Sequence, residues 1–294
     1  MRTLRFHQVD VFADQPLAGN PLAVFTSADG LSTDQMQAIA REMNLSETTF
    51  VMAAAAAGDA RVRIFTPVAE LPFAGHPTVG TACELVRLGL VEAVEPVTRV
   101  VLELDAGPTV VEVNVRDGLP VAATVHQGPP RFGSQVAPEE AAAVLRLATS
   151  DLHADLPPTT VGTALTYTII PLLSTEALAR VAPDMQILGA FEHAHAEVYP
   201  CAFTGVTDPW VEARGLFPLL GIPEDPATGS AAGPLAAYMA RAGLLSPQEE
   251  RVVLQGRHVG RPSRLTVSVS AGLADVLVGG AVQLVARGEL YLPG

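Results

Sequence analysis

Two short segments far apart in the chain combine residue types that could transfer a proton and bind an anion. Pro77–Ala82 and Pro226–Ala231 share the pattern Pro-x-x-Gly-[Ser/Thr]-Ala, and the second copy begins 149 residues after the first in a chain of 294. The residue before each copy is a proton-transfer candidate, His76 in one and Asp225 in the other. The repeat predicts two similar halves, each presenting a helix start and an acid/base group to a site between them.

The repeated pattern suits a helix start that binds an anion. Backbone N–H groups in the first turn lack intrahelical partners, and the helix dipole attracts negative charge. Proline fixes the entry of the chain, and glycine lets a ligand approach the backbone. The N–H groups of Gly229 and Ser230 and the Ser230 hydroxyl are therefore candidate ligands of a carboxylate. An Arg-x3-Pro pattern upstream of each copy, from Arg63 and from Arg214, extends the repeat.

These residues also have structural interpretations. His76 could bond to the backbone in a Gly-His-Pro turn, and Asp225 could be a helix N-cap. Together with Ser230 they would suggest a serine hydrolase, but the chain lacks the Gly-x-Ser-x-Gly of a nucleophile elbow there. His193 and His195 form a His-x-His pair without a third ligand nearby, which favours a solvated loop over a metal site.

The composition indicates a globular protein long enough for two domains. Eighteen Lys and Arg residues against 31 Asp and Glu residues give a net charge of −13, which argues against nucleic acid and anionic membranes as partners. Cys83 and Cys201 have no metal-ligand spacing and suggest a reducing compartment. Residues 1–7 lack the apolar run of a signal peptide, and no stretch approaches the ~20 apolar residues of a membrane span. We therefore expect a cytoplasmic protein.

Hydrophobic patterning predicts many strands and a few helices, hence an α+β fold. The expected helices are Ser32–Met43, Pro77–Leu88, Glu139–Leu147 and Ser230–Ala242, with Gly89 and Gly243 as stops and Pro234 near the first turn of the last one. The expected strands are Leu4–Phe12, Pro21–Phe25, Thr48–Met52, Arg61–Phe65, Val97–Leu104, Val110–Val115, Val121–Gln127, Thr163–Pro171, Glu197–Phe203, Leu265–Val269, Ala274–Val278 and Val282–Val285. Turn residues at Arg116–Pro120 place the boundary between domains 1–118 and 119–294, and the last strand is a candidate to return to the first domain.

Several segments, spread nearly end to end, resemble the PhzF family of phenazine-biosynthesis isomerase-like proteins. They are Val9–Phe12, Gly19–Phe25, Leu45–Val51, Leu71–Gly80, Glu224–Gly233, Gln255–Gly256 and Gly260–Ser263. The resemblance implies the diaminopimelate-epimerase-like fold. Two pseudo-symmetric domains would each form a curved antiparallel sheet around a central helix, with the helices after His76 and Asp225 in that central place.

The same resemblance implies a cofactor-free and metal-free isomerase that shifts a proton on a small anionic metabolite similar to trans-2,3-dihydro-3-hydroxyanthranilate. It also suggests a homodimer. Glu47 would be the general base, which works best with its pKa raised toward the operating pH by burial. His76 and Asp225 would assist proton transfer, and the substrate would be held by Gly75, Gly229, Ser230 and Asn20.

Two alternatives remain open from the sequence. Related racemases and epimerases use two facing cysteines, but Cys83 and Cys201 stand at unrelated places. A PhzF-like protein could also bind a small molecule without turning it over. The second Arg-x3-Pro carries its aromatic residue, Phe217, one place later than the family pattern, and the stretch Gln186–Trp210 could shape specificity.

Overall fold

The chain divides into two compact units in a computed structural model that describes residues 2–203 and 210–292. Unit 1 contains residues 1–126 and 279–294, and unit 2 contains residues 127–278. The boundary follows β8 (Leu119–His126), not residue 118, because β8 pairs with β7 (Gly107–Arg116) in unit 1. The final strand, β18 (Val276–Leu292), returns to unit 1 and pairs along β1 (Arg2–Val11).

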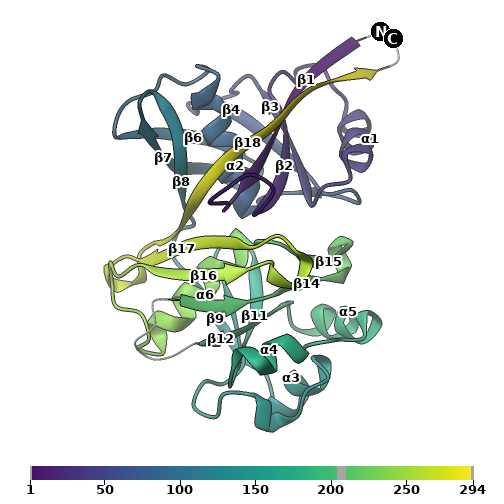
Figure 1. The fold of residues 1–294 in the computed structure, drawn as a ribbon, viewed down its shortest axis with the longest axis vertical. Helices are drawn as coiled ribbons and strands as arrows, with labels where there is room; N and C mark the ends of the chain where they lie inside the picture. Colours follow the sequence, from purple (N-terminus) through teal and green to yellow (C-terminus); the bar gives the residue numbers. More distant parts are fainter. Residues whose placement is uncertain (1, 204–209, 293–294) are drawn as a thin grey trace. The chain divides into compact units, whose positions relative to one another are not determined.

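Unit 1 is a mixed sheet with two helices (Figure 1). The pairing along the sheet runs β18–β1–β2–β3–β4–β6–β7–β8, with β2–β3 and β4–β6 parallel and the other pairs in this order antiparallel. The remaining elements of this unit are β2 (Asn20–Phe25), α1 (Thr33–Met43), β3 (Glu47–Met52), β4 (Ala60–Phe65), β5 (Glu70–Leu71), α2 (Gly75–Arg87) and β6 (Val97–Leu104).

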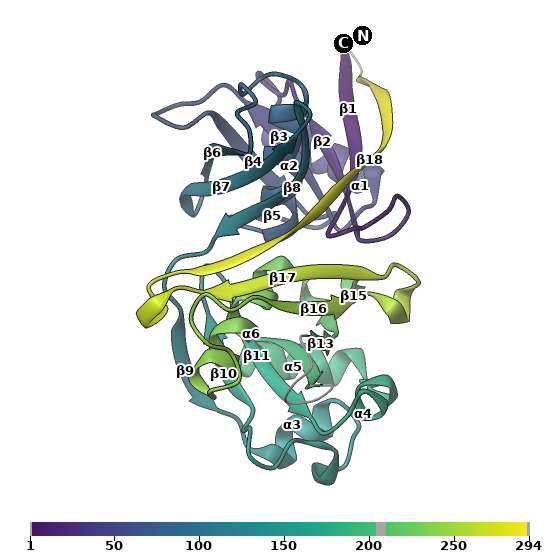
Figure 2. The ribbon, with the colours of Figure 1, turned by 60° about the vertical axis from the view of Figure 1, so that its left-hand side comes forward.

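Unit 2 repeats the same order of pairings, as Figure 2 helps to follow. It runs β9–β10–β11–β12–β13–β16–β17, with β11–β12 and β13–β16 parallel and the other pairs antiparallel. Its strands are β9 (Arg131–Gln135), β10 (Thr159–Gly162), β11 (Thr166–Leu172), β12 (Glu197–Phe203), β13 (Trp210–Ala213), β14 (Gly215–Phe217), β15 (Ile222–Asp225), β16 (Arg251–Gln255) and β17 (Ser263–Val269). Its helices are α3 (Pro138–Val144), α4 (Thr175–Arg180), α5 (Met185–Ala194), α6 (Gly229–Arg241) and the short 3-10 turns Thr149–Asp151, Pro218–Leu220, Arg257–Val259 and Ala271–Leu273. The shared topology confirms the α+β class and the duplication, with parallel pairs added to the expected antiparallel sheets.

One buried helix is central to each unit. α2 packs against β1, β2, β7 and β8, and α6 packs against β10, β11 and β17. Both helices have 13 residues and are buried over most of their length. Each is followed by a left-handed glycine, Gly89 or Gly243, a conformation that glycine adopts without strain. Gly80 is needed for close packing, because a Cβ there would lie 2.7 Å from side-chain atoms of Val11 and Leu22.

The structure changes the register of the internal repeat. α2 begins at Gly75 and α6 begins at Gly229, a separation of 154 residues and not 149. In this register both helices are preceded by Glu-x-Pro-x-x, from Glu70 and from Glu224, and both end in arginine. The Pro-x-x-Gly motifs are therefore not equivalent: Pro77 lies inside the first turn of α2, whereas Pro226 precedes α6. His76 consequently corresponds to Ser230.

Other expectations also differ from the structure. Pro234 lies inside α6, where it removes the N–H that would bond to the carbonyl four residues earlier. The expected strand Thr163–Pro171 begins too early, because residues 163–165 form the turn between β10 and β11. The expected strand Val282–Val285 is part of the long β18. The short helices α4 and α5 were not expected, and α5 contains His193. Within the stretch Gln186–Trp210, residues 204–209 lie outside the described part of the chain.

Two arginine–glutamate pairs stand at corresponding places before the central helices. Nε and Nη2 of Arg63 donate to Glu70 at 2.6 Å each, with the side chains 19% and 33% exposed. Arg214 donates to Glu224 from the same two atoms at 2.9 and 2.7 Å, with 9% and 13% exposed. Arg214 also donates from Nη1 to the carbonyls of Leu178 and Val181. The second pair therefore holds the end of α4 to β15.

Within residues 2–203 and 210–292, no helix is both long enough and apolar enough to cross a membrane.

Candidate active site

Three predicted site residues of unit 1 meet at the first turn of α2. Asn20 is the first residue of β2 and Glu47 is the first residue of β3. Because these strands are parallel and adjacent, both residues stand at the same edge of the sheet. His76 is the second residue of α2, which packs over this part of the sheet. Topology therefore gathers three side chains that are separated in sequence by as many as 56 residues.

The three side chains form a buried row. The Asn20 amide nitrogen lies 3.2 Å from Nδ1 of His76, and Nε2 of His76 lies 3.4 Å from Oε2 of Glu47. All three residues are at most 8% exposed. Since the amide N–H₂ only donates, Nδ1 accepts, and the proton of the neutral ring is on Nε2, facing Glu47. Burial lowers the pKa of His76 from 6.5 to about 3, so the ring is neutral at physiological pH.

We predict that His76 does not titrate between about pH 5 and pH 8, the range in which an ordinary histidine changes charge. Its ring signals in histidine-labelled NMR spectra should therefore stay constant over this range. Because the folded-state pKa lies below the ordinary value, His76 contributes stability that is present above about pH 6.5 and is lost as the pH falls toward 3. A midpoint for His76 near 6.5 would contradict this assignment.

The N-termini of the two central helices differ from those of α1, α4 and α5, whereas α3 also lacks a side-chain cap. Ser32, Ser174 and Asp184 cap α1, α4 and α5 with side-chain hydrogen bonds. The N-cap residues of α2 and α6, Ala74 and Thr228, make no such bond. First-turn N–H groups that no side chain caps can bind an anionic ligand. Gly75 and Gly229, the first residues of the two helices, thus stand where a carboxylate could be held.

In unit 2, Asp225 and Ser230 flank the turn into α6. Oδ2 of Asp225 accepts a hydrogen bond of 2.7 Å from the Thr228 hydroxyl. The Ser230 hydroxyl lies 2.7 Å from the Tyr167 hydroxyl, and both groups are buried. Since Thr228 is the N-cap, the interpretation of Asp225 as a cap was wrong. A phenol as the partner of Ser230, in place of an imidazole, argues against the hydrolase interpretation.

Gln255, at the end of β16, holds the turn between Asp225 and Thr228 in place. The sequence did not mark Gln255 as a site residue. Its amide nitrogen donates to the Asp225 carbonyl and the Thr228 hydroxyl at 2.8 and 3.0 Å. Its oxygen accepts from the Thr228 N–H and the Tyr199 hydroxyl at 3.1 and 2.8 Å. Nothing in the local sequence pattern reveals this role, because the partners lie 27 to 56 residues away.

We predict that Gln255→Leu lowers kcat by about 10²-fold, since a small displacement of an acid/base group can have that effect. It should also lower the free energy of unfolding by about 1–3 kcal/mol for each buried polar group left without its partner. Tyr199→Phe removes only one of the four bonds and is the matched control, with most activity kept. Steady-state kinetics of both variants measure the change in kcat, and thermal unfolding measures the change in stability. A normal kcat in a folded Gln255→Leu variant would show that the turn between Asp225 and Thr228 does not need Gln255 to keep its position.

The structure thus brings the predicted residues together as two groups: Glu47, His76, Asn20 and Gly75 in unit 1, and Asp225, Gly229 and Ser230 in unit 2. Asn20 directs its amide to His76, which gives it a positioning contact in addition to the expected contact with substrate.

Among the described residues, no group of three or more His, Cys, Asp or Glu side chains could hold a metal ion. His195 is the C-cap of α5 and its Nε2 lies 2.9 Å from Glu140.

Neither cysteine can serve as a catalytic thiol. Cys83 lies inside α2 and Cys201 in β12, both 0% exposed and both free. Burial raises the pKa of each thiol far above its ordinary value, so neither forms the reactive thiolate at neutral pH. We predict that native protein treated with iodoacetamide keeps its activity, and that both cysteines become labelled only after unfolding. Mass spectrometry of the labelled protein checks this prediction.

The duplicated fold is that of the epimerase and racemase class. A hydroxyproline epimerase structure from Agrobacterium vitis covers 98% of this chain at a TM-score of 0.69 and 14% identity, a likeness of fold alone. The family model described as phenazine biosynthesis-like protein, PhzC-PhzF, matches residues 9–288, and the chain belongs to this family.

Relatives across the whole chain agree with this membership. A trans-2,3-dihydro-3-hydroxyanthranilate isomerase from Pseudomonas chlororaphis is 41% identical over 92% of this chain and 91% of its own length. One from Pseudomonas aeruginosa is 38% identical over 98% and 99%. The structure of a PhzF family protein from Bacillus anthracis covers 99% of this chain and 100% of its own at a TM-score of 0.88 and 27% identity. The protein is an isomerase.

Proposed function

We propose that this isomerase shifts a proton between carbons of a small carboxylate similar to trans-2,3-dihydro-3-hydroxyanthranilate, without a cofactor. The observation that carries the proposal is the buried contact between the Glu47 carboxylate and the neutral imidazole of His76, 3.4 Å apart at the uncapped start of α2. A carboxylate that is buried beside a neutral ring can act as a general base on a C–H bond of a bound substrate.

In the proposed reaction Glu47 removes a proton from a substrate carbon, and the electron pair of the broken C–H bond moves into the adjacent double-bond system. Protonated Glu47 then returns a proton to a different carbon of that system, so that substrate and product have the same atoms. Nε2 of His76 lies 3.4 Å from Oε2 of Glu47 without a hydrogen bond between them. We propose that the Nε2–H donates to this carboxylate as the charge of the carboxylate changes during the reaction. Asn20 keeps that proton on Nε2 by donating to Nδ1.

The groups of unit 2 are proposed to bind and polarise the substrate. N–H groups at the start of α6, at Gly229 and Ser230, would hold the carboxylate, and the N–H of Gly75 would do so at α2. Asp225 is a second acid/base group, held by Thr228 and by the Gln255 contact to its carbonyl. The Ser230 hydroxyl, paired with Tyr167, is available for a hydrogen bond to a substrate oxygen.

Proton-exchange NMR in D₂O tests the proposal. The purified protein would be incubated with trans-2,3-dihydro-3-hydroxyanthranilate and with a panel of small amino and hydroxy acids. Isomerisation, with deuterium incorporated at carbon, is the expected result. Absence of exchange on every compound would contradict the proposed substrate class while leaving the family membership intact.

Racemisation of amino or hydroxy acids is the second candidate, because the fold is shared with racemases. The buried cysteines exclude the two-thiol form of that reaction. The same D₂O experiment distinguishes the two, since racemisation exchanges a proton at one carbon without moving a double bond. Binding without turnover would give no exchange in either case.

The assembly and the compartment are also proposals. We propose a homodimer in the cytoplasm, on the family resemblance and on the two free thiols, which suit a reducing compartment. Sedimentation velocity of the purified protein tests the dimer.

A further inference from the structure

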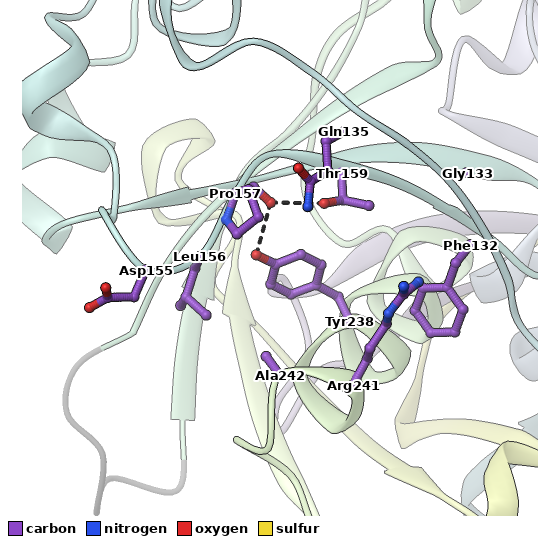
Figure 3. Close-up of a pocket in the computed structure, with 10 residues that line it drawn as sticks. All are labelled: Phe132, Gly133, Gln135, Asp155, Leu156, Pro157, Thr159, Tyr238, Arg241 and Ala242. Carbon is purple, nitrogen blue, oxygen red and sulfur yellow. Dashed lines mark hydrogen bonds between the residues drawn. The ribbon is translucent and has the colours of Figure 1, made fainter.

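A cavity lies beside the C-terminal end of α6, within unit 2 (Figure 3). It encloses about 220 Å³. Its wall comes from β9, β10, the segment before β10 and the last turns of α6, and is formed by Phe132, Gly133, Gln135, Asp155, Leu156, Pro157, Thr159, Tyr238, Arg241 and Ala242. The Arg241 guanidinium stacks on the Phe132 ring, with Cζ 4.5 Å from the ring centroid. This contact holds the charged group at one side of the cavity.

The corrected register of the internal repeat shows what stands at the same place in unit 1. A separation of 154 residues aligns Arg241 with Arg87 and Tyr238 with Glu84. In unit 1 the Glu84 carboxylate is fully buried, 2.7 Å from Nε of Arg87 and 2.6 Å from Nδ1 of His7 on β1. The place beside the terminal arginine of α2 is therefore occupied by the chain's own carboxylate.

Unit 2 keeps the arginine but replaces this carboxylate. The Tyr238 hydroxyl donates to the Pro157 carbonyl at 3.0 Å, close to β10, the strand that corresponds to β1. Among the described residues Arg241 forms no salt bridge, and its side chain is exposed. Unit 2 thus has a cation and a cavity where unit 1 has an ion pair.

We propose that this cavity binds a small organic carboxylate, with its negative charge on Arg241 and its apolar part against Phe132, Leu156 and the Tyr238 ring. Gln135 and Thr159 add polar groups to the wall. The ligand carries one negative charge, because Asp155 lines the opposite side of the cavity in Figure 3 and would repel a second. It is small, since sites for drug-sized molecules usually enclose about 300–1,000 Å³. This site is separate from the groups at the N-terminus of α6.

Titration with 4-fluorobenzoate, followed by fluorine NMR of the probe, tests the proposal on the full chain. Arg241→Met should weaken binding by about tenfold or more, because it removes the charged donor of the carboxylate. Arg264→Met makes the same change at an exposed arginine of β17 in the same unit and should leave the affinity unchanged. The neutral analogue 4-fluorobenzamide should bind at least about tenfold more weakly to the wild type.

Ser230→Ala separates this site from the proposed active site, and the affinity should not change in that variant. The proposal is overturned if Arg241→Met binds the probe as tightly as the wild type, if Ser230→Ala abolishes binding, or if the wild type does not bind the probe. Loss of binding in Arg264→Met as well would show a general effect of net charge, and would also overturn it.

Discussion

Glu47→Gln should lower the rate of isomerisation and of carbon-bound deuterium uptake by about 10²–10⁴-fold, the usual contribution of a general base. The substitution keeps the size of the side chain and its contact with Nε2 of His76. It removes the electron pair that accepts the proton from carbon. KM should change little, since the glutamine occupies the same volume at the start of β3.

The control for this variant is Glu42→Gln, at an exposed glutamate of α1 in the same unit. It makes the same chemical change and should have wild-type activity. Both variants should show the thermal unfolding of the wild type. Full exchange activity in Glu47→Gln would remove Glu47 from the reaction and would leave Asp225 as the candidate base.

Arg214→Met should lower the free energy of unfolding by about 3–5 kcal/mol, the effect of breaking a buried ion pair by removing one partner. Its guanidinium makes four hydrogen bonds, two to Glu224 and two to the carbonyls of Leu178 and Val181. The substitution leaves a largely buried carboxylate and two carbonyls without their donor. Because Glu224 is next to Asp225, activity should fall as well.

Arg63→Met is the matched comparison, since Arg63 makes the same two-point contact with Glu70 at the corresponding place in unit 1. Its pair is more exposed, and solvent-exposed ion pairs contribute about 0–1 kcal/mol. Denaturant unfolding of the two variants should therefore give a clearly larger loss for Arg214→Met. Equal losses would show that burial does not decide the strength of these two pairs.

The local sequence determined much of the fold. The ends of α1, α2 and α6 could be predicted to within a few residues, because the Ser32 cap of α1 and the glycines after α2 and α6 are features of the local sequence. Alternation of apolar residues predicted most strands of unit 1. Family motifs identified the isomerase and selected Glu47, which spacing alone did not.

Contacts between distant segments decided the register of the internal repeat and the surroundings of the candidate site residues. The equivalence of His76 and Ser230 depends on the separation of α2 and α6, whose first residues Gly75 and Gly229 are 154 positions apart. The sequence motifs match at a separation of 149 residues, and nothing in the sequence marks that match as the wrong register. The neutral state of His76 arises from its burial in the folded chain. Its contact with Asn20 likewise depends on the packing of α2 against β2. Gln255 and the cavity beside Arg241 likewise depend on strands and helices that meet only in the folded chain. Burial and hydrogen-bond partners are properties of the tertiary structure, and they determine which of the candidate residues can act on a substrate.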